Sequence, residues 1–135
     1  MISNRKPITL TVSAGSGKYH LTADLTSIGD DIIVSIWGGT KPHIGSVVAS
    51  IPRPSLDDPH RCSATSSVIN FAGHKDEAVA RMFSEKIAAS FNTHTVVTAG
   101  IHVDNLTGAG MRKILENSEI LCSKLIKKWR GNIGK

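Results

Sequence analysis

The sequence contains few aromatic residues, which make up only 4% of its 135 positions. A hydrophobic core must therefore be built mainly from Ile, Val, Leu and Ala. Hydrophobic residues of all types still amount to 40% of the chain, which excludes an intrinsically disordered protein. A chain of this length fits a single domain over residues 1–135, and we expect residues 1–7 and 131–135 to be flexible ends.

Cysteines and long apolar runs are scarce as well. Cys62 and Cys122 match no metal-ligand spacing and no CxxC motif, and the sequence leaves open whether they pair in a disulfide. No apolar run approaches the roughly 20 residues that cross a bilayer. Residues 1–7 lack the apolar stretch of a signal peptide. We therefore expect a cytoplasmic protein that does not act in a membrane.

The chain also lacks several catalytic and nucleotide-binding signatures. It has no G-x-S-x-G nucleophile motif, no Walker A motif and no dinucleotide-binding glycine fingerprint.

The net charge is +5, but much of the basic excess lies near the C-terminus, where cations favourably oppose a helix dipole. These basic residues are Lys124, Lys127, Lys128, Arg130 and Lys135. We therefore expect no nucleic-acid partner.

Turn residues and alternating β-formers predict a first half made of strands, at residues 8–13, 19–28, 31–37, 44–51 and 65–71. The strand at 31–37 is apolar almost throughout, which indicates a central position covered on both faces. The glycines after Trp37 are expected to end that strand. Pro52, Pro54 and Pro59 are expected to lie in a loop, because proline cannot donate to a strand ladder.

In the second half, the spacing of apolar residues predicts an amphipathic helix at Asp76–Phe91 and a strand at 95–103. A last helix is predicted from Thr107 or the following glycines to about Trp129. The core face of the last helix would carry Met111, Leu115, Leu121, Leu125 and Trp129. A run of strands before the first helix argues against a doubly wound sheet. We expect an α+β fold in which a single, largely antiparallel sheet of about six strands carries two helices on one side.

Three segments at the ends of these elements combine glycine with histidine. The first lies between two strands and contains Gly38, Gly39, Lys41, His43 and Gly45. Its glycines let a ligand approach the backbone closely, and Lys41 and His43 can hold an anion there. A tight hairpin loop, in which the glycines only satisfy turn geometry, explains the same residues.

The second segment, Gly73, His74, Lys75 and Asp76, stands at the start of the amphipathic helix. A helix N-terminus offers free N–H groups and the positive end of the helix dipole, which suit a phosphate or a carboxylate. The alternative is an ordinary cap, with Asp76 accepting a hydrogen bond from the next turn.

The third segment contains His102, Asp104 and Asn105 at the end of a strand. His102 and Asp104 point to the same face of a strand, so we expect them to be close neighbours. Such a pair can bind metal, relay protons or orient a ligand. Zinc usually takes three or four protein ligands, so the pair alone favours a simple surface contact over a metal site.

These segments carry a resemblance to a known family. The runs at 36–39, 42–45, 73–76 and 100–105 resemble those of the prenylated-flavin chaperone-like family, over about residues 21–125. The resemblance implies a fold similar to that of the small proteasome-assembly chaperones. It also implies an accessory role, because a member accompanies gallate decarboxylase, a UbiD-like enzyme that uses prenylated FMN.

The resemblance therefore implies prenylated FMN or FMN as the ligand and a UbiD-like decarboxylase as the partner, with the three segments as candidate binding residues. Trp37 is the aromatic side chain best placed to stack on a flavin ring, and a site between two copies would compensate for the few aromatics. Two alternatives stay open. One is a small metal-assisted enzyme that uses His43, His74, His102 and Asp104. The other is a ligand-free homo-oligomeric interaction module.

Overall fold

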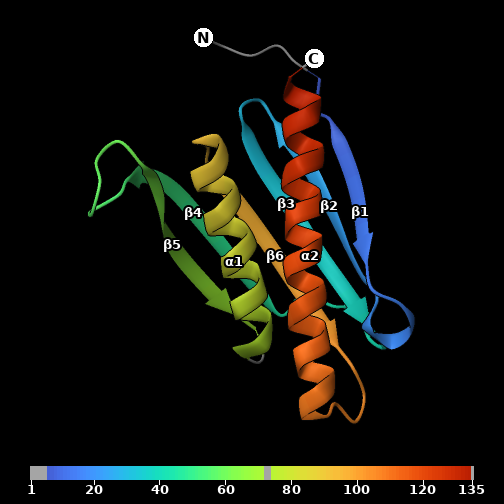
Figure 1. Ribbon diagram of the computed structural model, residues 1–135. Helices are drawn as coiled ribbons and strands as arrows, with labels where there is room; N and C mark the ends of the chain where they lie inside the picture. Colours follow the sequence, from blue (N-terminus) through green and yellow to red (C-terminus); the bar gives the residue numbers. More distant parts are fainter. Residues whose placement is uncertain (1–5, 72–73, 135) are drawn as a thin grey trace.

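The computed structural model describes residues 6–71 and 74–134, which form one sheet with both helices on the same face (Figure 1). The strand order in the sheet is β1-β2-β3-β6-β4-β5. Only β3 and β6 pair in parallel, and the other neighbouring strands are antiparallel. The predicted α+β fold, a largely antiparallel sheet with helices on one side, is confirmed. The elements are β1 (Thr9–Ala14), the 3-10 helix η1 (Gly17–Tyr19), β2 (Leu21–Ile28), β3 (Asp31–Gly39), β4 (Ser46–Pro54), β5 (Cys62–Asn70), α1 (His74–Phe91), β6 (Thr95–His102) and α2 (Gly108–Ile133).

The core lies between the helices and the sheet and is mainly aliphatic, as the composition predicted. Helix α1 packs on β4, β5 and β6, whereas α2 packs on β1 and β2. The predicted apolar stripe of α1 is buried at Val79, Phe83 and Ile87. No helix in the described ranges is both long enough and apolar enough to cross a bilayer.

Strand β3 is central in the sheet, but the prediction that it is covered on both faces is wrong. Both helices lie on the same side, so Ile33, on the other side, remains 36% exposed. The strand also continues past Trp37 to Gly39, because the parallel register with β6 pairs Gly39 with His102. The glycines thus belong to the strand that was expected to end before them.

Strand β4 likewise runs through two of the prolines that were expected in a loop. Pro52 pairs with Ala64 and Pro54 with Cys62 of β5. Beyond Ser50, β4 no longer pairs with β6, so this part of the strand has one open edge. Proline is tolerated there because the N–H that it lacks is not needed by a second neighbour.

Helix α2 begins after Thr107, whose side chain accepts a hydrogen bond from the amide of Gly110 at 3.0 Å. The helix reaches Ile133, beyond the Trp129 predicted from the sequence. The predicted core face was wrong at Leu115, which is 40% exposed, while the neighbouring Ile114 is fully buried. Ile114 lies on the same side of the helix as Leu121, two turns further on, and Leu115 is rotated away from that side.

Candidate functional site

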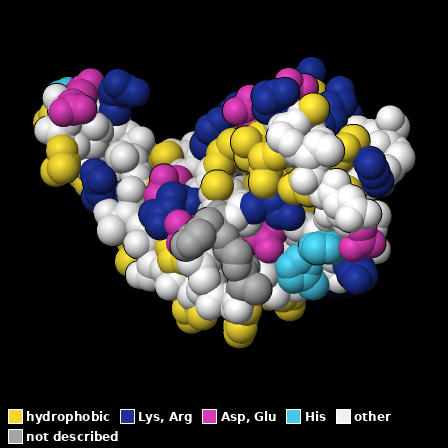
Figure 2. Space-filling view, turned by 90° about the horizontal axis from the view of Figure 1, so that it is seen from below, with side chains coloured by type: hydrophobic (Ala, Val, Ile, Leu, Met, Phe, Trp, Pro, Cys, Tyr) yellow, Lys and Arg dark blue, Asp and Glu magenta, His cyan; other side chains and the backbone are white. Residues whose placement is uncertain are grey.

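The loop after β3, the first turn of α1 and the end of β6 meet at one end of the molecule. Figure 2 looks onto this end and shows histidine side chains beside acidic and basic ones. The amide of Thr40 donates to the carbonyl of His102 at 2.6 Å, and the amide of Gly45 donates to the carbonyl of Ala99 at 2.9 Å. These bonds fasten the loop between β3 and β4 to β6. The sequence could not decide whether the segments meet, and the parallel pairing of β3 with β6 brings them together.

Asp76 lies at the centre of this arrangement, and its side chain is only 5% exposed. Its Oδ1 accepts a hydrogen bond from the amide of Ile101 at 2.9 Å, and its Oδ2 lies 3.2 Å from Nε2 of His43. The alternative that Asp76 is an ordinary cap is incomplete, because its Oδ1 also accepts from an amide of strand β6. Asp76 therefore joins all three segments through one carboxylate.

His43 is held from both sides of its ring. Nδ1 lies 3.0 Å from the carbonyl oxygen of Lys41, opposite the contact of Nε2 with Asp76. A carbonyl and an ionised carboxylate are both pure acceptors, so the ring can donate to both only as an imidazolium. The two contacts thus fix the orientation of the His43 ring at the surface, where its side chain is 37% exposed.

Two glycines allow the close packing of these segments. A Cβ atom on Gly100 would collide with the backbone carbonyl of His43, and one on Gly45 would collide with the carboxylate of Asp76. The hairpin-loop explanation of Gly45 is therefore incomplete, because the residue also makes room for a side chain from α1. Gly38 and Gly39 lie within β3, where Gly39 packs against the backbone of His102.

His102 and Asp104 form the predicted contact, with Nε2 and Oδ1 3.1 Å apart. Lys41 approaches the same carboxylate oxygen at 3.8 Å. The hydrogen bond from His102, and next the charge of Lys41, hold the pKa of Asp104 below its usual 3.8. Asn105 follows in a left-handed conformation, with φ of 55°, in the turn towards α2.

A shallow pocket of about 310 Å³ lies between Lys41, His43 and His102. Basic side chains from two of the predicted segments therefore line one hollow. Within the described ranges, no three His, Cys, Asp or Glu side chains lie close enough together to hold a metal ion. Of the second segment, Gly73 lies outside the described residues, as does the side chain of His74, and Lys75 is half-buried at the start of α1.

Sequence reasoning missed Thr40, which links the first and third segments. Its hydroxyl donates to the carbonyl of His102 at 3.2 Å and accepts from the amide of Asp104 at 3.0 Å. Threonine between a glycine and a lysine is ordinary in a loop, so the sequence carries no signal for this role. It is visible only once β3 and β6 are placed side by side.

The fold belongs to a class already seen among assembly chaperones. A chain of a chaperone complex for yeast 20S proteasome assembly matches with a TM-score of 0.62 over 93% of this chain and 96% of that chain. The two chains are 13% identical, so the likeness concerns the fold alone.

The sequence identifies the family, which the likeness in fold does not. Residues 15–130 match the prenylated flavin chaperone LpdD-like domain, and the chain belongs to this family. Protein LpdD of Lactiplantibacillus plantarum (strain ATCC BAA-793 / NCIMB 8826 / WCFS1) is 26% identical over 121 residues, which cover 86% of this chain and 82% of LpdD. The resemblance noted from the glycine and histidine segments is thereby confirmed.

Proposed function

We propose that this protein is a cytoplasmic accessory chaperone that holds prenylated FMN, or FMN, for a UbiD-like decarboxylase. Membership of the prenylated flavin chaperone family supports the ligand class. The observation that carries the proposal is the pocket between Lys41, His43 and His102. In this proposal the pocket receives the phosphate of the flavin.

The chemistry of the pocket suits a phosphate. The side chain of Lys41 is 72% exposed, and its ammonium group lies 3.8 Å from Asp104, so it can turn towards an incoming anion. The ring of His43, held between the carbonyl of Lys41 and the carboxylate of Asp76, forms another wall of the pocket. Hydrogen bonds between an ammonium group and phosphate oxygens are short and strong compared with neutral ones.

Trp37 is the side chain that we assign to the flavin ring. It pairs with Gly100 in the sheet register, so both residues lie on the face that the helices leave uncovered. The backbone of His43 passes directly against Gly100. A flavin with its phosphate near His43 can therefore extend over the sheet towards the indole of Trp37, where aromatic stacking stabilises it.

Titration of the purified protein with FMN, prenylated FMN and riboflavin tests the proposal. We expect FMN and prenylated FMN to bind. Riboflavin lacks the phosphate group, so it should bind much more weakly. Lys41→Gln should weaken FMN binding by about tenfold. Lys18→Gln is the matched control, because Lys18 is another exposed lysine and lies outside the pocket.

Co-purification with a UbiD-like decarboxylase tests the partner. A protein that binds neither the flavin nor the enzyme would disprove the proposed role. Binding to the enzyme without binding to the flavin would keep the partner and remove the cofactor from the proposal.

A second candidate, a homo-oligomeric interaction module, is favoured by the uncovered face of the sheet. Large apolar side chains protrude on the side opposite the helices (Figure 2). On strands β3, β4 and β5 these include Ile33, Ile51 and Ile69, which are 36%, 60% and 62% exposed. Homodimer interfaces are richer in apolar area than the rest of a protein surface. Sedimentation at high concentration tests this candidate, and a strictly monomeric protein would count against it.

A further inference from the structure

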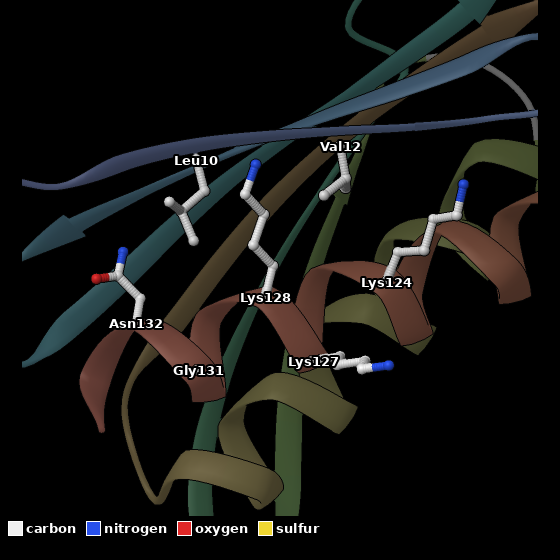
Figure 3. Close-up of a pocket in the computed structure, with 7 residues that line it drawn as sticks. All are labelled: Leu10, Val12, Lys124, Lys127, Lys128, Gly131 and Asn132. Atoms are coloured by element: carbon white, nitrogen blue, oxygen red, sulfur yellow. The ribbon is translucent and has the colours of Figure 1, made fainter. Parts of the chain in front are cut away.

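A second hollow lies away from the candidate site, between the edge strand β1 and the C-terminal half of α2. Its volume is about 660 Å³, and it shares no lining residue with the pocket around Lys41. Figure 3 shows Lys124 and Lys128 reaching from α2 towards β1, beside the side chains of Leu10 and Val12. The lining residues are Leu10, Val12, Lys124, Lys127, Lys128, Gly131 and Asn132. A volume of this size lies within the range of small-molecule sites, about 300–1,000 Å³.

Two lysines of α2 are held in place by the backbone of β1. Nζ of Lys124 donates to the carbonyl of Ser13 at 2.9 Å, and Nζ of Lys128 donates to the carbonyl of Thr11 at 3.1 Å. An ammonium group has three N–H donors, so each lysine keeps donors for a further acceptor. Lys127, by contrast, extends away from β1 in Figure 3.

Within the described part of the chain, no acidic group pairs with the lysines of this groove. Both acceptors are neutral carbonyl groups. No ion pair found within the described residues involves Lys124, Lys127 or Lys128. The residues that the structure describes therefore leave room for a negatively charged ligand beside these lysines.

The floor of the groove is apolar. Leu10 and Val12 alternate along β1, so both face the helix side of the sheet, where α2 leaves them only half-buried. The groove thus combines an apolar floor with two cations at its rim. A ligand that complements both needs an apolar body and an anionic group.

We propose that the groove between β1 and α2 binds a small organic phosphate, with the phosphate between Lys124 and Lys128 and its apolar body against Leu10 and Val12. The two carbonyls that position the ammonium groups are two residues apart on an extended strand, about 7 Å. A single phosphate group can accept hydrogen bonds from two cations at that spacing. This site does not depend on the proposed flavin site, and either can fail without the other.

Edge protection is the competing explanation for the same lysines. Lysine at a sheet edge prevents another strand from pairing there, and Lys124 and Lys128 occupy two outward carbonyls of β1. Protection alone requires no ligand. The two explanations are therefore separated by a binding measurement.

Titration with 1-naphthyl phosphate, followed by amide chemical shifts in NMR spectra, tests the proposal. We expect saturable shifts at Leu10, Val12 and Lys128, and weak binding of either 1-naphthol or inorganic phosphate alone. Replacing both Lys124 and Lys128 by glutamine should weaken binding by at least about tenfold. Replacing both Arg112 and Lys113, two exposed basic residues of α2 outside the groove, by glutamine removes the same charge and should weaken binding by less than about threefold.

Circular dichroism and a thermal melt of each variant establish that it is folded before binding is compared. Chemical-shift changes that appear only around Lys41 and His102 would show that the probe binds in the first pocket. That result would disprove binding in the groove. Equal losses of binding in the two double variants would show that only net charge matters and would overturn the site. Absence of any saturable shift would leave edge protection as the role of the lysines.

Discussion

Nε2 of His43 lies 3.2 Å from Oδ2 of Asp76, and the carboxylate is almost completely buried. The two residues are far apart in the sequence, on the loop before β4 and on the first turn of α1. The other oxygen of Asp76 accepts from the amide of Ile101 on β6. One buried carboxylate therefore sets the position of the loop, the helix and the strand that surround the candidate pocket.

Asp76→Ala should destabilise the fold by about 2–4 kcal/mol, because it leaves a buried amide at Ile101 and the ring of His43 without their acceptor. Asp76→Asn should destabilise the fold by less, since its amide oxygen can still accept a hydrogen bond from the amide of Ile101. Urea denaturation measures both values. Asp57→Ala, in the exposed loop between β4 and β5, serves as the control and should change stability by no more than about 0.5 kcal/mol. Equal effects at both positions would contradict the role of Asp76.

Gly100→Ala should destabilise the protein by about 1–3 kcal/mol, because the new methyl group collides with the backbone carbonyl of His43. It should also displace the loop and weaken flavin binding. Gly131→Ala is the matched control, since a Cβ there meets nothing within 4 Å. In a helix this change should stabilise by about 0.5–1 kcal/mol. Thermal melts of the two variants should therefore move in opposite directions.

The carboxyl pKa of Asp104 should lie below 3.8 in the folded protein, chiefly because of the hydrogen bond from His102. His102→Ala should raise this pKa towards 3.8, and Lys41→Gln should raise it less, because its charge is the weaker cause. A pKa lowered by folding contributes stability above 3.8, and this contribution is lost as the pH falls through the lowered value. NMR titration of the Asp104 carboxyl measures the shift. A pKa unchanged by His102→Ala would contradict the assignment.

The two cysteines should react very differently with a thiol reagent. Both are free thiols, with Cys62 exposed on β5 and Cys122 buried in α2. Burial raises the pKa of the Cys122 thiol to about 11, so the reactive thiolate is rare at neutral pH. We expect one thiol per chain to react in the native protein and the second only after unfolding. Mass spectrometry of the labelled peptides identifies which thiol reacts first.

Local patterns in the sequence were sufficient to predict where the main helices and strands lie and which fold class they form. Alternation along β2 and the four-residue spacing of Val79, Phe83 and Ile87 reflect the side of each element that must face a core. The predicted ends of strands were wrong where pairing with a strand distant in the sequence determines them. Gly39 stays in β3 because β6 pairs with it, and Pro54 stays in β4 because that part of the strand has an open edge.

The sequence by itself determined that glycine and histidine segments stand at the ends of elements, and that His102 and Asp104 are neighbours. Only the tertiary structure decided that these segments meet, because the parallel pairing of β3 and β6 joins residues far apart in the chain. It also decided the role of Asp76, whose partners come from the loop before β4 and from β6. A short-range pattern records which face of an element is buried, whereas a site built from several elements depends on contacts that no short-range pattern contains.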